Sequence, residues 1–128
     1  TGLIRFEMHP FPLDGLALRA HALCRTLPTD SYFKMVDTLL DNQESWIGAA
    51  EPVTELKKFA KFAGISSDTF DKMMQDRSYL EAIVQLRQDA VSRYEISSTP
   101  SFVVNEDKIF SGALSFDEFL AELNAFGI

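Results

Sequence analysis

Two side chains in this sequence have the types and spacing of a nucleophile and its base. His21 and Cys24 are three residues apart, so on a helix they would share one face, and a histidine there could activate a thiol. Cys24 also belongs to a stripe of Ala and Leu side chains, where a thiol behaves as a small, inert hydrophobic group with a raised pKa. The stripe favours a packing role over a catalytic one.

The tripeptide Ser98-Thr99-Pro100 is the second candidate for chemistry. A proline at the threshold of a strand removes one backbone donor, and the peptide bond before a proline adopts the cis form far more readily than other bonds. From composition alone the cis form is expected in only about 5–6% of such bonds, so the default interpretation is an ordinary trans proline at the start of a strand. The tripeptide marks a place where the approach to a sheet could be reshaped.

Other kinds of site find no support in the sequence. The histidines and Cys24 show no recognised metal-ligand spacing, so we expect no metal. No Gly-rich phosphate loop is present, and we expect no cofactor. A single cysteine excludes both an intramolecular disulfide and a Cys-x-x-Cys redox pair within these residues.

Composition limits the class of protein and of partner. The chain has 128 residues, of which 46% are hydrophobic and eleven are Phe, as expected for one folded domain. Twelve Lys and Arg against nineteen Asp and Glu give a net charge of −7, which argues against binding nucleic acid or anionic lipid. No apolar run reaches the roughly 18 residues of a membrane span.

The elements that would position these residues follow from hydrophobic spacing. Alternation over residues 3 to 8 predicts a strand, and spacings of three and four predict five helices between residues 14 and 95. Residues 101–104 and 108–110, joined by the turn-forming triplet 105–107, predict a β-hairpin. Ser78 with Glu81, and Ser115 with Glu118, have the spacing of capping boxes that begin the fifth helix and the last one.

With these elements in order, the chain resembles the DsbA-like branch of the thioredoxin superfamily, which comprises bacterial thiol-disulfide oxidoreductases of the cell envelope. Four stretches carry the resemblance, namely Phe11-Pro12-Leu13-Asp14 through the helix to Cys24, the helix end from Asn42-Gln43 to Trp46, Ser98-Thr99-Pro100-Ser101-Phe102, and Ser111-Gly112-Ala113-Leu114-Ser115-Phe116. The resemblance implies the α/β class and an incomplete thioredoxin-like fold as a single partial domain over residues 1–128. Its helical insertion covers about residues 14–95, and a β-hairpin and C-terminal helix cover 97–128.

The resemblance also implies a site and a reaction. In that family the proline of Thr-Pro is cis and faces the Cys-x-x-Cys motif, and the backbone before it pairs with a substrate peptide. Ser98, Thr99 and Pro100 would therefore bind substrate. The reaction would exchange a catalytic disulfide with thiol-containing or disulfide-containing protein substrates in the periplasm or cell envelope.

The departure from the family concerns its first strand and the helix that carries Cys-x-x-Cys, neither of which is in this sequence. No catalytic residue is therefore expected in this chain. We expect it to be a fragment whose sheet is completed by a missing N-terminal segment or by a second chain, because the absent strand would lie between residues 3–8 and 101–104. Two alternatives remain: a redox-inactive module that binds extended peptides or protein partners, and catalysis by Cys24 with His21 as its base.

Overall fold

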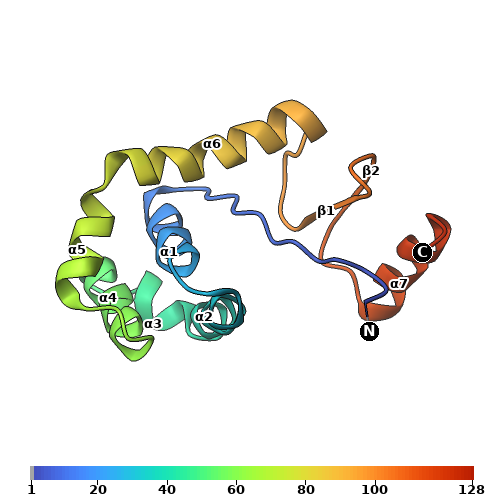
Figure 1. Cartoon of the computed structure of the whole chain (residues 1–128). Helices are drawn as coiled ribbons and strands as arrows, with labels where there is room; N and C mark the ends of the chain where they lie inside the picture. Colours follow the sequence, from blue (N-terminus) through green and yellow to red (C-terminus); the bar gives the residue numbers. More distant parts are fainter. Residues whose placement is uncertain (1) are drawn as a thin grey trace. The chain divides into compact units, whose positions relative to one another are not determined.

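The computed structural model describes residues 2–128, which divide into two compact units. The first unit ends at Arg87 and the second begins at Gln88. Figure 1 shows the elements in chain order, which are α1 (Gly15–Arg25), α2 (Thr29–Asp41), α3 (Gln43–Ile47), α4 (Pro52–Phe62), α5 (Ser67–Gln75), α6 (Arg77–Tyr94), β1 (Ser101–Val104), β2 (Lys108–Ser111) and α7 (Phe116–Ala125).

Local signals in the sequence account for several helix ends in the first unit. The Asp14 carboxylate accepts a hydrogen bond from the backbone N–H of Ala17 at 2.7 Å and so begins α1. Pro52 occupies the first turn of α4, where its missing N–H costs nothing. After that helix, Gly64 adopts φ of +84°, a left-handed conformation that glycine takes without a steric penalty.

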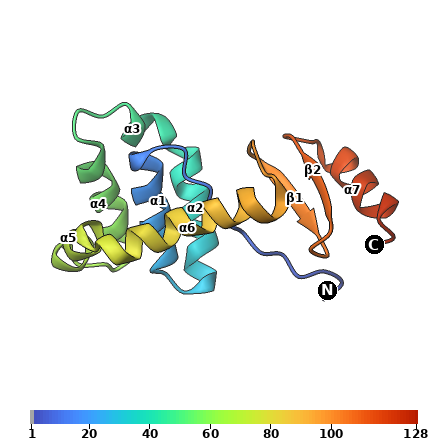
Figure 2. The same cartoon turned by 90° about the horizontal axis from the view of Figure 1, so that it is seen from above.

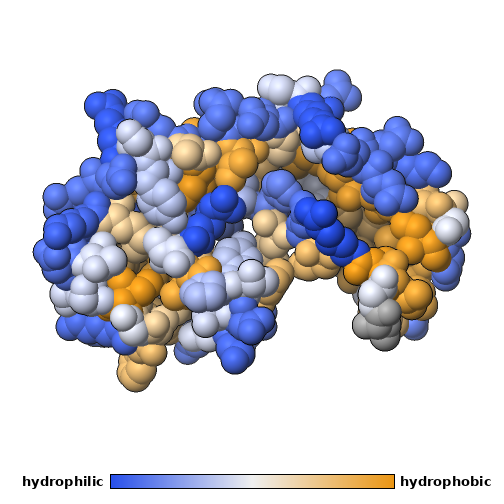
Figure 3. All heavy atoms as spheres, in the orientation of Figure 1, coloured by the Kyte–Doolittle hydropathy of each residue, from blue (hydrophilic) through white to orange (hydrophobic). Residues whose placement is uncertain are grey.

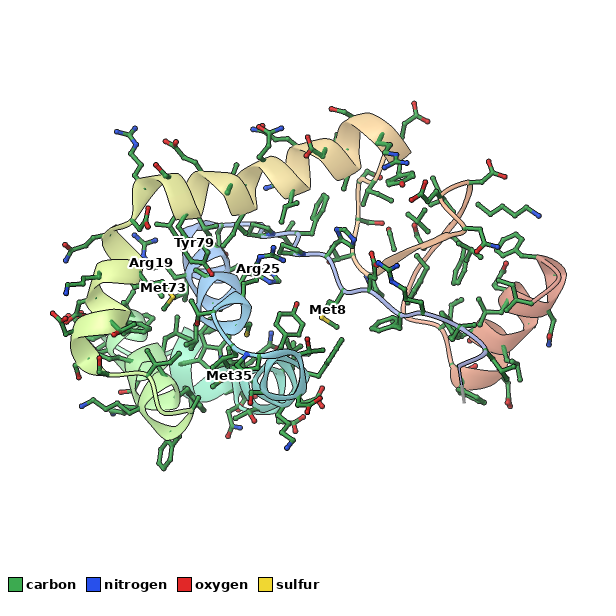
Figure 4. All side chains as sticks on the ribbon, viewed as in Figure 1. Met8, Arg19, Arg25, Met35, Met73 and Tyr79 are labelled. Carbon is green, nitrogen blue, oxygen red and sulfur yellow. The ribbon has the colours of Figure 1, made fainter. Side chains whose placement is uncertain are left out.

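The core of the first unit lies between the helices. Its buried members are Ala20, Leu23, Cys24, Met35, Leu39, Trp46, Leu56, Ala60, Phe70 and Met73. Figure 4 shows Met35 and Met73 among the helices that surround them. The buried indole of Trp46 donates its Nε1–H to the carbonyl oxygen of Leu39 at 2.9 Å, so this polar atom enters the core with a partner.

The part of α6 that belongs to the first unit makes two polar contacts with segments earlier in the chain. The Tyr79 hydroxyl donates to the carbonyl oxygen of Ala22 at 2.7 Å. The Arg87 guanidinium donates to the carbonyl oxygen of Pro12 at 2.8 Å and lies over the ring of Phe11, an arrangement that favours a cation. Hydrophilic side chains cover the outward side of α6 in Figure 3.

The structure corrects the strand predicted over residues 3 to 8. These residues form no strand and lie mostly exposed, with Leu3 84% accessible. A strand requires a hydrogen-bonded neighbour, and the described part of the chain supplies none to this segment. Its ring contact in the first unit joins Phe6 to Phe33, with 6.1 Å between the ring centroids.

The second unit contains the predicted β-hairpin, which the structure confirms. β1 and β2 pair antiparallel in a register that places Phe102 opposite Phe110. Asn105 and Glu106 turn the chain with φ of 51° and 60°, and Asp107 donates its backbone N–H to the carbonyl oxygen of Val104 at 3.2 Å. Over residues 2–128 these strands form a sheet of two strands.

Helix α7 covers one face of this hairpin, as Figure 2 shows. Phe102 stacks on Phe110 with centroids 4.9 Å apart, and Phe119 of α7 meets Phe102 at 5.0 Å and Phe110 at 5.6 Å. Such rings contribute both buried area and favourable edge contacts. Phe126 completes the cluster at 6.1 Å from Phe110, so the four rings hold α7 on the sheet.

Candidate functional site

The edge of β1 that faces away from β2 is open. The Gly112 N–H donates to the carbonyl oxygen of Pro100 at 2.9 Å, and antiparallel pairing alternates between groups that face the partner and groups that face away. In the observed register the backbone N–H and C=O of Ser101 and Val103 therefore point outward. No other strand pairs with them among the described residues, so β1 offers unpaired donors and acceptors.

The predicted site residues come directly before this edge. Ser98, Thr99 and Pro100 are all exposed, and the peptide bond between Thr99 and Pro100 is cis. The Thr99 backbone N–H and C=O have no hydrogen-bond partner within residues 2–128. The three residues thus extend the open edge of β1 by chain continuity.

Two serine hydroxyls next to the site were not predicted from the sequence. The Ser101 hydroxyl donates to the carbonyl oxygen of Ser98 at 2.7 Å and lies 2.8 Å from the Ser111 hydroxyl. Ser101 and Ser111 are opposite each other in the hairpin, a position where hydroxyl pairs commonly form hydrogen bonds. A serine at the start of β1 and another at the end of β2 were the available signal, but the pairing depends on a register that the sequence left open.

The sheet face opposite α7 carries an apolar pair beside the Ser101–Ser111 pair and is uncovered in this unit. Val103 and Ile109 are paired in register on that face and are 37% and 42% accessible. Natural proteins normally shield both the edge and the apolar face of a short sheet. The open edge and the exposed Val103–Ile109 pair together define the candidate site as a surface suited to an added strand.

Cys24 and His21 do not form a catalytic pair in this structure. Cys24 is 3% accessible, and burial raises the pKa of its thiol to about 12. Burial, assisted by the nearby Arg25, lowers the pKa of His21. No hydrogen bond joins the two side chains within the described residues. The thiol is therefore neutral at physiological pH and packs in the core of the first unit.

Residues 2–128 show little sign of other kinds of site. They contain no group of three or more His, Cys, Asp or Glu side chains placed to hold a metal ion. A shallow cavity of about 210 Å³ in the first unit is lined largely by apolar groups between α1 and α6, and Arg87, which borders it, is already bonded to Pro12. No described helix is both long enough and apolar enough to cross a bilayer.

Comparison with known proteins adds to this geometry. The model of the family described as thioredoxin matches residues 1–125. The chain belongs to the thioredoxin family. Neither the curated proteins nor the solved structures gave a match. The match confirms the predicted thioredoxin superfamily. The described residues of this thioredoxin-family chain are mostly helical and form one small antiparallel sheet, which is consistent with the predicted α/β class.

Proposed function

We propose that this chain is part of a DsbA-like thiol-disulfide oxidoreductase of the bacterial periplasm or cell envelope. The observation that carries the proposal is the open edge of β1, which begins at Thr99-Pro100 in a chain of the thioredoxin family. Thr99 pairs through its backbone with an extended segment of a substrate protein, as in other recognition by strand addition. Ser98 and Pro100 border that contact.

The reaction needs two cysteines from outside residues 1–128. The chain has one cysteine, and Cys24 is buried as a neutral thiol. A thiolate of the substrate attacks the catalytic disulfide, forms a mixed disulfide and releases one catalytic thiolate; the second substrate thiolate then displaces the other catalytic cysteine. Two electrons pass from the substrate dithiol to the catalytic disulfide, so the substrate leaves oxidised and the enzyme reduced.

The same proposal assigns the rest of the open edge. An added strand, from another segment of the protein or from a second chain, pairs with Ser101 and Val103 and places its own side chains beside the exposed Val103. That strand stabilises the hairpin by satisfying its outward backbone groups and burying part of the apolar surface of Val103. Thr99, just beyond this strand, stays available to the substrate.

A second function has support from the chain itself. Because residues 1–128 hold no cysteine pair, the thioredoxin-family domain could act as a redox-inactive module that binds extended peptides or protein partners at the same edge. The two functions share the binding surface and differ only in whether a Cys-x-x-Cys pair is brought to it.

The experiment that separates them uses the protein made from its natural gene. The oxidised protein is treated with iodoacetamide before and after reduction, and the alkylated cysteines are mapped by mass spectrometry. The oxidoreductase proposal predicts a pair that becomes alkylated only after reduction, together with catalysed oxidation of a reduced substrate protein that Cys24→Ser leaves unchanged. A gene product in which Cys24 is the sole cysteine, without such activity, would favour the binding module.

A further inference from the structure

A chain of hydrogen bonds links β2 to the backbone just before the candidate site. The single hydroxyl proton of Ser101 is donated to the carbonyl oxygen of Ser98 at 2.7 Å. The 2.8 Å contact between the two hydroxyls then requires Ser111 to donate to Ser101. The direction of the chain is thus fixed, from Ser111 through Ser101 to Ser98.

Hydrogen bonds fix the backbone on both sides of Thr99. The serine hydroxyls fix the residue before it, and the pairing of the hairpin fixes the residue after it. The carbonyl oxygen before Thr99 belongs to Ser98 and accepts from Ser101. The carbonyl oxygen after it belongs to Pro100 and accepts the Gly112 N–H at 2.9 Å. Both neighbouring carbonyls are therefore occupied, while the N–H and C=O of Thr99 have no partner within residues 2–128.

We propose that Ser101 is a positioning residue, whose hydroxyl holds the Ser98 carbonyl and thereby orients the Thr99 backbone to receive a peptide strand. The inference rests on the proposed function, since it specifies how the same edge is prepared for its ligand. A preordered backbone binds with less loss of conformational entropy than a mobile one. Removing the hydroxyl leaves the Ser98 carbonyl without this anchor and weakens peptide binding.

The test compares four forms of the full chain. Ser101→Ala removes the hydroxyl, Ser101→Thr retains one, and Ser97→Ala is the matched control, because Ser97 is exposed in the same loop and its side chain makes no described hydrogen bond. The probe is a synthetic Thr/Val-rich peptide of about ten residues, long enough to form one strand. Affinity is measured by titration, and the order of the Thr99 amide in the free protein by heteronuclear NMR relaxation.

We expect Ser101→Ala to weaken peptide binding roughly three- to tenfold, the loss of one neutral hydrogen bond, and to make the Thr99 amide more mobile. Ser101→Thr and Ser97→Ala should match the wild type in both measurements. Equal affinity and equal mobility in Ser101→Ala and the wild type would overturn the inference, as would equal losses in the alanine and threonine variants. If the wild type binds no peptide but Ser101→Ala still loosens Thr99, the proposed function fails while the positioning role stands.

Discussion

Cys24 in the folded protein is expected to react with iodoacetamide about a thousandfold more slowly than a cysteine in an unfolded chain at neutral pH. Burial raises the pKa of its thiol from 9.0 to about 12, and the reactive species is the thiolate. A shift of about three pKa units lowers the thiolate fraction by about three powers of ten. The 3% accessibility of the side chain slows the reagent further.

The measurement is the rate of carboxamidomethylation followed by mass spectrometry, with the urea-unfolded protein as its reference. A folded-state rate close to that of the unfolded chain would restore Cys24 as a candidate nucleophile.

The raised pKa of Cys24 also predicts how the stability of the protein depends on pH. The pKa of the Cys24 thiol is higher in the folded state than in the unfolded state. The contribution of this difference to the free energy of unfolding is therefore complete below about pH 9 and is lost as the pH rises towards 12, by at most about 1.4 kcal/mol per pH unit. In Cys24→Ala the free energy of unfolding should no longer show this loss between about pH 9 and 12.

Phe70→Ala is expected to lower the free energy of unfolding of the helical unit by about 3–5 kcal/mol. Phe70 is 1% accessible and packs within the core cluster, so its truncation loses the burial of a ring and leaves a cavity. Phe62→Ala is the matched control, since Phe62 is also helical but 93% accessible and should change stability by less than about 0.5 kcal/mol. Urea unfolding followed by circular dichroism measures both.

The comparison is sharp because the two substitutions remove the same atoms. Only the surroundings of the ring differ, and so the difference between the two variants reports burial. Similar losses of stability in both, or a loss below about 1 kcal/mol in Phe70→Ala, would contradict the assigned core of the first unit.

Of the two helix starts predicted from a Ser-x-x-Glu capping box, the structure contains one. The predicted capping box of α7 is formed, with Glu118 N–H bonded to the Ser115 hydroxyl and the Glu118 carboxylate bonded back to Ser115; these bonds lower the pKa of Glu118. The same Ser-x-x-Glu spacing at Ser78 does not begin α6. There the Asp76 carboxylate accepts the Tyr79 N–H at 3.0 Å, because α5 ends just before it and leaves Asp76 at the capping position.

The two predicted β segments differ for a reason that lies beyond local sequence. The hairpin at residues 101–111 has its partner strand within reach of a short turn, so its alternating pattern is realised as a sheet. Residues 3–8 have an equally regular pattern but no neighbour among the described residues. Alternation predicts which side chains share a face, and only a hydrogen-bonded partner makes the segment a strand.

The candidate site was predictable in part. Thr99-Pro100 was recognisable from its place before a strand in the sequence of elements. The Ser101 bond to Ser98 was not, because it depends on the exact bend of the loop. The Arg87 bond to Pro12 joins residues 75 apart in the chain, and no spacing rule connects positions so distant.

Amide hydrogen exchange along β1, with and without the extended peptide, tests the central claim most directly. In the protein made from its natural gene, the amides of Phe102 and Val104 face β2 and those of Ser101 and Val103 face the added strand, so all four should exchange slowly in both states. The Thr99 amide should exchange rapidly in the free protein, and with saturating peptide we predict that protection rises at Thr99 alone. A Thr99 amide already protected in the free protein, or unchanged at saturation, would contradict a backbone that is open to receive a peptide strand.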